Sequence, residues 1–156
     1  MDHPEHLHEI MKSLNMVAAA YGKRLICSIH PRTSSRIASD LKLQMHPLVE
    51  FHEPFGFFDF VKLERHTLCA LTDSGTVQEE CCIIHVPTVT LRKTTERPET
   101  VDCGSNIVSG LNAERIAASV RLMTELNREW ECPKGYLADN VAATVVKFLC
   151  GGKRHV

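Results

Sequence analysis

The sequence has no marked excess of charge of either sign. Its 156 residues include 18 Lys and Arg against 19 Asp and Glu, a formal net charge of -1. Nucleic-acid-binding domains and polybasic membrane anchors carry a basic surface, so this balance predicts neither kind of partner. No apolar run reaches the roughly 20 residues of a membrane-spanning helix, and the polar start MDHPEHLHEI does not fit a signal peptide.

Cysteine pairs with the spacing of a zinc ribbon or a redox site are also missing. The 7 cysteines are scattered, several of them within apolar segments, and no C-x-x-C occurs. Free thiols in a reducing, cytoplasmic setting are therefore expected. The 9 histidines do not predict a metal site, because the crowded His3, His6 and His8 sit on a charged N-terminal turn and are expected to be solvated.

What the sequence does contain is an alternation of short β-rich runs with helical patterns. Short, nearly all-apolar strands separated by helices predict a Rossmann-like, doubly wound parallel α/β sheet in one domain. The expected strands are 24–29, 48–54, 67–72, 87–92 and 105–110. The expected helices are 4–21, 32–41, 55–66, 74–85, 111–129 and 139–152, with a polar loop at 93–104.

Polar clusters follow four of the expected strands. They are His30-Pro31-Arg32, Glu53-Pro54-Phe55, Asp73-Ser74-Gly75 and the run from Arg92 to Glu99. Ligands of open α/β sheets bind beyond the carboxyl ends of the strands, so four such clusters predict a binding site at this edge.

The stretch LTDSGTVQEE, residues 71–80, is the centre of that prediction. Ser74 is a candidate N-cap, and Gly75 allows the backbone to approach a ligand, so the helix start favours a phosphate group. The alternative is a plain helix cap, because the segment is neither a Walker loop nor GxGxxG. Glu80 fits an acceptor for ribose hydroxyls, with a solvated surface carboxylate as an equally open alternative.

Three further groups belong to the same hypothesis. His30 offers a proton-transfer group at a strand end, although a histidine before proline is more often structural. Arg97, with Arg92 and Lys93, adds positive charge, and an arginine fork can bind two diphosphate oxygens. Phe60 is one of four phenylalanines that serve either as packing residues or as a stacking face for a base.

These segments together resemble a known family. DSGTVQEE, VPTVTLRKTTERPE and GSNIVSG, with HPRT and PFGFFDFVKL before them, resemble the C-terminal half of the non-hydrolysing UDP-N-acetylglucosamine 2-epimerases. The segments Glu-Glu-Cys-Cys and ETVDCGSN are most similar to those of one branch of the family. That branch makes UDP-N-acetyl-L-fucosamine by inverting C2 of UDP-2-acetamido-2,6-dideoxy-L-talose.

The resemblance implies a role for each matching residue. The family has a two-domain GT-B fold, and residues 1–156 would be its C-terminal, UDP-binding domain. Ser74 and Gly75 would hold the diphosphate, Glu80 the ribose and Phe60 the uracil, with His30 (as a catalytic residue) and Arg97 facing the diphosphate and cleft. The implied reaction eliminates UDP to a 2-acetamidoglycal and adds it back with C2 inverted, without metal or nicotinamide cofactor. It would serve capsule or O-antigen polysaccharide synthesis.

The chain also departs from the family. Lys93 stands where aspartate is usual, and His85-Val86-Pro87 replaces a Gly-Val-Pro step. The family's N-terminal domain, with its catalytic acids, and the first strand of the C-terminal domain are not in this sequence. We expect strands 24–29 and 67–72 to close up, or another chain to fill the gap between them.

The chain alone is accordingly expected to lack epimerase activity, to bind UDP or a UDP-N-acetylhexosamine weakly, and to form a homo-oligomer through the open sheet edge. A stand-alone nucleotide-sugar-binding or scaffolding module without catalysis is the alternative function. A GT-B glycosyltransferase is a third possibility, because a fold does not determine its chemistry.

Overall fold

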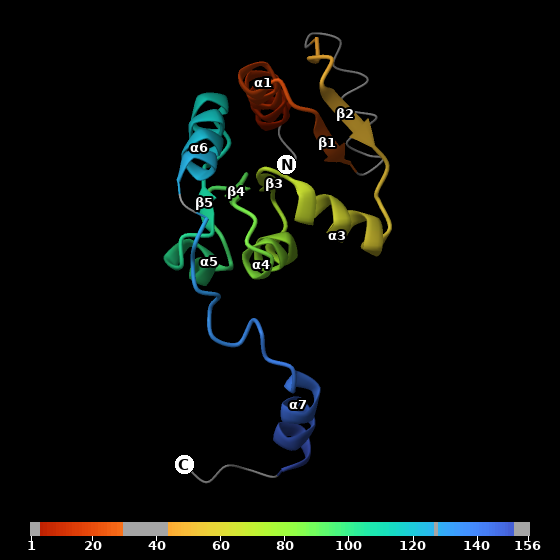
Figure 1. Cartoon of the computed structure of the whole chain (residues 1–156), viewed down its shortest axis with the longest axis vertical. Coiled ribbons are helices and arrows are strands. Elements are labelled where there is room, and N and C mark those ends of the chain that lie inside the picture. The colour runs from red at the N-terminus through yellow and green to blue at the C-terminus, as the bar shows by residue number, and fades with distance from the viewer. Residues whose placement is uncertain (1–3, 30–43, 127, 152–156) are drawn as a thin grey trace.

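The computed structural model describes residues 4–29, 44–126 and 128–151, and these form an α/β fold (Figure 1). The five described strands are β1 Leu25–Ser28, β2 Val49–His52, β3 Ala70–Thr72, β4 Thr88–Thr90 and β5 Asn106–Val108. The described helices are α1 Pro4–Tyr21, α3 Phe57–His66, α4 Gly75–Ile83, α5 Pro98–Asp102, α6 Ala113–Glu125 and α7 Val141–Cys150.

All described strand pairs are parallel, as the alternating pattern predicted. They do not, however, form one sheet: β1 pairs with β2, and β3, β4 and β5 pair in that order as a second sheet. No pairing joins β1 to β3 among the described residues, so the first of the two alternatives, that these strands close up, is wrong, and the second, that another chain fills the gap, stays a prediction. Side chains of α1 pack against both sheets, so the two are held together without the strands meeting.

Helices α1 and α6 make the core that joins the two sheets. Ile10 and Leu14 of α1 pack with Val49 of β2 and Ile116 of α6, while Val17 packs with Val89 of β4 on the other sheet. In Figure 1 these two helices lie above the three-stranded sheet and α4 and α5 lie below it. The doubly wound arrangement is therefore confirmed for β3, β4 and β5.

Local signals placed the helix ends well in most cases. Asn112 caps α6 by accepting a hydrogen bond from the Arg115 backbone N–H at 3.1 Å. Gly22 ends α1 with φ +58°, a left-handed conformation that glycine adopts without a Cβ clash. The expectation of a polar loop over 93–104 was wrong in part, because helix α5 begins within that segment at Pro98. Proline is a favoured first residue of a helix.

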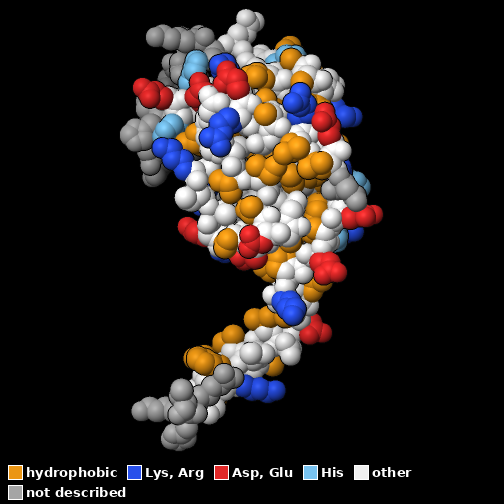
Figure 2. Space-filling model, turned by 90° about the vertical axis from the view of Figure 1, so that its left-hand side faces the viewer, with side chains coloured by type: hydrophobic (Ala, Val, Ile, Leu, Met, Phe, Trp, Pro, Cys, Tyr) orange, Lys and Arg blue, Asp and Glu red, His pale blue; other side chains and the backbone are white. Residues whose placement is uncertain are grey.

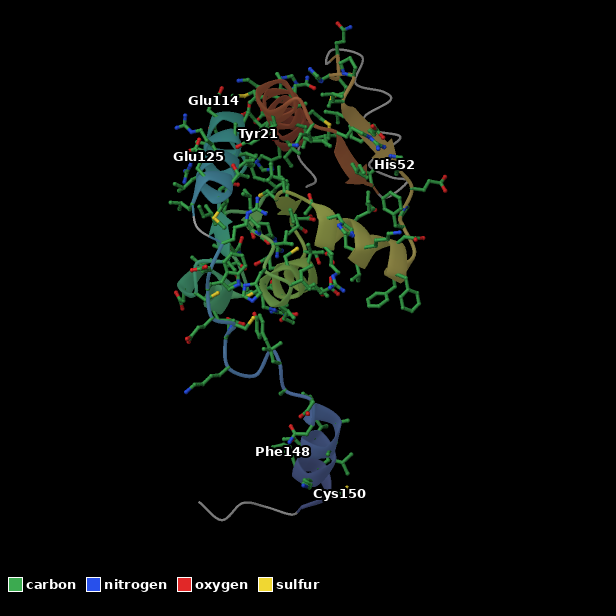
Figure 3. All side chains as sticks on the ribbon, viewed as in Figure 1. Tyr21, His52, Glu114, Glu125, Phe148 and Cys150 are labelled. Atoms are coloured by element: carbon green, nitrogen blue, oxygen red, sulfur yellow. The ribbon has the colours of Figure 1, made fainter. Side chains whose placement is uncertain are left out.

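Helix α7 stands apart from the rest of the molecule (Figures 1 and 2). Its side chains are exposed along its whole length, including Phe148 at 75 % and Leu149 at 73 %. Figure 3 labels Phe148 and Cys150 on this helix, far from the sheets. Among the described residues no helix has both the length and the apolar character needed to cross a membrane.

Candidate functional site

The N-terminus of α4 is the centre of the candidate site. Ser74 occupies the N-cap position with an extended backbone (φ -88°, ψ 131°), and its own N–H donates to Thr72 Oγ1 at 3.0 Å. The backbone N–H groups of Gly75, Thr76 and Val77 have no acceptor among the described residues. Three outward N–H groups at the positive end of a helix favour a bound anion.

Arg97 lies directly against this helix start. A methyl group built on Gly75 would lie 3.6 Å from Arg97 Cζ and 3.7 Å from Nη2, so the guanidinium is within van der Waals reach of this position. Arg97 Nε is ion-paired with the Glu79 carboxylate, and Nη1 donates to the Glu96 carbonyl at 3.0 Å. The structure thus brings Gly75 and Arg97 together, as predicted for the site. It also pairs Arg97 with Glu79, an ion pair that the sequence did not predict.

A buried network of neutral side chains holds the Arg97 loop in place. Gln78, only 1 % exposed, accepts hydrogen bonds from Thr95 Oγ1 at 2.6 Å and Asn106 Nδ2 at 3.2 Å, and donates to the Ser74 carbonyl at 3.2 Å. Thr95 Oγ1 in turn accepts from the Arg97 backbone N–H at 3.0 Å. Because every member has a partner, the loop is fixed relative to α4.

Sequence reasoning missed this network. A glutamine inside the helical pattern and a threonine-rich loop are its only signals in the sequence, and neither identifies a partner. Asn106 is central to it, because its Oδ1 accepts from Thr90 Oγ1 at 2.8 Å and its Nδ2 also donates to Thr100 Oγ1 at 3.1 Å.

Of the remaining predicted residues, Phe60 lies on α3 and Glu80 on α4. Phe60, half-buried, is one turn before Glu64 on that helix, and the Glu64 carboxyl group is a hydrogen-bonding neighbour of the Glu80 carboxyl group on α4. Glu80 is half-buried rather than solvated. His30 lies outside the described residues, as does the helix expected at 32–41.

The segment after α6 covers the far end of α4. Trp130 Nε1 donates to the Cys82 carbonyl at 3.0 Å, and its ring stacks on His85 with a centroid separation of 5.3 Å. His85 has φ +57°, the left-handed region that favours glycine. A backbone in this region accounts for the glycine in the Gly-Val-Pro step of the resembled family. Nothing in the structure explains Lys93, which is exposed.

The described residues contain no group of three or more His, Cys, Asp or Glu side chains arranged to hold a metal ion. All seven cysteines are free thiols. Burial raises the pKa of the Cys81 and Cys69 thiols to about 12, so both are neutral at physiological pH.

Comparison with known proteins gives a consistent result. Residues 1–150 match the sequence family described as UDP-N-acetylglucosamine 2-epimerase. The UDP-N-acetylglucosamine 2-epimerase of Methanocaldococcus jannaschii is 42 % identical over 156 residues, covering 98 % of this chain and 42 % of the relative.

Solved structures agree with the sequence match. The M. jannaschii enzyme in complex with UDP-GlcNAc and UDP superposes with a TM-score of 0.88 at 39 % identity, over 97 % of this chain and 42 % of that one. The Neisseria meningitidis UDP-GlcNAc 2-epimerase bound to UDP-GlcNAc gives 0.82 at 27 % identity, over 97 % and 42 %. The chain thus spans about two fifths of the length of these relatives.

Proposed function

The chain belongs to the UDP-N-acetylglucosamine 2-epimerase family, and we propose that residues 1–156 form the UDP-binding domain of such an enzyme. The observation that carries this proposal is the start of α4, where three backbone N–H groups, with no acceptor in the described part of the chain, lie beside the Arg97 guanidinium. A diphosphate satisfies both, because it accepts several hydrogen bonds and is doubly charged.

Each residue named from the sequence has a place in this proposal. Ser74 and Gly75 hold the diphosphate through the backbone, and Arg97 neutralises its charge. Glu80 accepts hydrogen bonds from the ribose hydroxyls, and Phe60 lies against the uracil. The catalytic role of His30, which lies outside the described residues, is proposed from the family resemblance alone. The M. jannaschii relative, whose structure holds UDP-GlcNAc and UDP, supports a UDP-sugar as the ligand.

In the whole enzyme, removal of the C2 proton and cleavage of the C1–oxygen bond to UDP would give a 2-acetamidoglycal. Re-formation of that bond, with a proton returned to the opposite face of C2, completes the inversion. This domain holds UDP in place between the two steps, which avoids the entropic cost of capturing it again. The proton-transferring acids are proposed to lie in a partner N-terminal domain, so the chain alone has no activity.

Two finer assignments belong to the same proposal. We assign the sugar to the UDP-2-acetamido-2,6-dideoxy-L-talose branch on the Glu-Glu-Cys-Cys and ETVDCGSN segments, with a role in capsule or O-antigen polysaccharide synthesis. The seven free thiols support a cytoplasmic location.

The enzymatic part of the proposal is tested by incubating the chain with each UDP-sugar and following the configuration at C2 by proton NMR. Inversion of C2 by the pure chain would contradict the proposal that the proton-transferring acids lie in another domain.

The binding site itself is tested by calorimetric titration with UDP. Arg97→Ala is expected to weaken binding by about tenfold or more, because it removes the charge beside the helix start. Arg121→Ala, which removes the same charge from an exposed position on α6, is the matched control and leaves binding unchanged. Equal losses in the two variants would mean that only net charge matters and that α4 is not the site.

A further inference from the structure

Glu64 is an unusual residue for the middle of this fold. It lies on α3, is 5 % exposed, and is the one described residue with buried side-chain oxygens, Oε1 and Oε2, that find no hydrogen-bond donor. An ionised carboxylate in such a place is strongly destabilising, so the group must either find a partner or hold a proton.

The neighbour of Glu64 explains how it is accommodated. Its carboxyl group is a hydrogen-bonding neighbour of Glu80 on α4, yet two carboxylates are both acceptors and cannot bond to each other. A single proton converts the pair into a donor and an acceptor. Burial, followed by the Glu80 charge and the hydrogen bond to it, raises the pKa of Glu64 to about 7. Glu64 is the deeper of the two and is the one that holds the proton.

The position of this pair relates it to the proposed UDP site. Glu64 and Phe60 are one turn apart on the same face of α3, and Glu80 is the carboxylate proposed for the ribose. We infer that Glu64 is a positioning residue, which in its protonated form donates a hydrogen bond to Glu80 and fixes that carboxylate for the ribose hydroxyls. This inference rests on the proposed role of Glu80.

A proton-dependent affinity follows from this arrangement. When Glu64 releases its proton to solvent, the hydrogen bond to Glu80 is lost and a second negative charge appears beside an anionic ligand. The groups that face Glu64 from α4 are Glu80 and the Cys81 thiol, and Cys81 stays neutral because the pKa of its thiol is raised to about 12. UDP-sugar affinity is therefore full below the pKa of Glu64 and falls as the pH rises through it.

The first experiment needs no ligand. The carboxyl carbon of Glu64, assigned by its loss in Glu64→Gln, is titrated by NMR in the whole chain. We expect a midpoint near the raised value of about 7, against the ordinary 4.5. Glu80→Gln should lower this midpoint, because the substitution removes the neighbouring charge and introduces an amide that can donate to Glu64. Glu79→Gln, one residue away, should not. An ordinary midpoint, or equal effects of the two variants, overturns the inference.

The second experiment measures binding of UDP-N-acetylglucosamine at pH 6 and pH 8 by calorimetry. This ligand is chosen because its diphosphate has no group that titrates in that range. The Kd of the native chain is expected to rise by about tenfold between the two pH values. Glu64→Gln should bind as tightly at pH 8 as the native chain does at pH 6, because its amide donates to Glu80 without titrating.

The outcomes separate this inference from the proposed function. Binding that does not change with pH, or a pH step that persists in Glu64→Gln, overturns the role of Glu64 but leaves the UDP site intact. Absence of binding by the native chain at both pH values overturns the proposed site, and the positioning role with it. A weakening of binding in Glu64→Gln that is equal at both pH values would show a purely structural role for Glu64 and also overturns the inference.

Discussion

The two sheets of this molecule are built in different ways. In the three-stranded sheet, β4 is buried at every position and has a neighbour on each side, and Asn106 of β5 joins Thr90 of β4 to Gln78 of α4 by hydrogen bonds. In the two-stranded sheet, β1 alternates between half-buried and exposed, and each strand has a single neighbour. The candidate site is attached to the three-stranded sheet, which is where a fixed geometry is needed.

The two sheets share one feature, which is an edge strand whose backbone groups face away from its strand partner. In the two-stranded sheet, the N–H groups of Leu25 and Ile29 donate toward β2, so Ile26 and Ser28 present theirs on the opposite side. In the three-stranded sheet, Ala70 donates to the β4 side, so Leu71 presents its groups away from β4. These edges of β1 and β3, like the outer edges of β2 and β5, are thus without a strand partner among the described residues. Such edges pair readily with other strands.

The largest effect is expected from breaking the network of the three-stranded sheet. Asn106→Ala removes the acceptor of the buried Thr90 hydroxyl and one hydrogen-bond donor each from Gln78 Oε1 and Thr100 Oγ1, and should lower the free energy of unfolding by about 3 kcal/mol. Asn15 is the matched control on the two-stranded side, where it donates to the Gln44 carbonyl and accepts from the His46 N–H at exposed or half-buried positions.

Asn15→Ala should cost about 1 kcal/mol or less, because water replaces the lost bonds. Both free energies are measured by urea denaturation followed by circular dichroism. Equal losses in the two variants would show that the two sheets do not differ in how their polar groups are buried.

A smaller effect is expected at the open edges. Sedimentation equilibrium should show concentration-dependent self-association of the chain, and Ile26→Lys should weaken it by about tenfold, because a charge at the edge opposes pairing. Ile26 is 40 % exposed, and Leu122 on α6, at 46 %, serves as the matched position for Leu122→Lys. A monomer at every concentration, or equal effects of both variants, would contradict association through this edge.

The sequence predicted the local features of this molecule better than its long-range contacts. Strands and long helices follow from local patterns, and all five described strands lie within the expected segments. The break between β1 and β3 is a long-range property that no local pattern records. The ion pair of Arg97 with Glu79 and the buried Glu64 depend on which helix faces meet, and nothing in VKLERH distinguishes Glu64 from a solvated glutamate.

His85 illustrates the opposite case, in which the sequence held a clue. Its departure from the family's Gly-Val-Pro step was visible in the sequence, but its meaning needed the backbone angle and the stacked Trp130. Physical reasoning alone reached an anion site at Ser74 and Gly75, and it left open whether Glu80 binds a ribose and whether Phe60 stacks on a base. The resemblance chose among these alternatives and named the ligand as UDP, because a backbone N–H group does not specify which anion it binds.

The smallest effect concerns the ion pair that joins the ends of β1 and β2. Arg24 donates from Nε and Nη2 to the two carboxylate oxygens of Glu50, at 2.6 and 2.7 Å. These hydrogen bonds from Arg24, with a lesser one from His52, lower the pKa of Glu50 from 4.5 to about 2. Because the pKa is lower in the folded chain, the pair stabilises the fold above about pH 4.5, and that contribution is lost as the pH falls toward 2.

We therefore expect acid to weaken the two-stranded sheet slightly before the three-stranded one. Arg24 is 64 % exposed, so the effect is small and is reduced by salt. In Arg24→Gln, the carboxyl carbon of Glu50, followed by NMR, should titrate near its ordinary value. In the native chain, the amides of β1 should be better protected from hydrogen exchange at pH 5 than at pH 3, and Arg24→Gln should remove this difference. The amides of β4, with no such pair, serve as the internal reference. An unchanged Glu50 titration in Arg24→Gln would mean that this ion pair does not distinguish the two sheets.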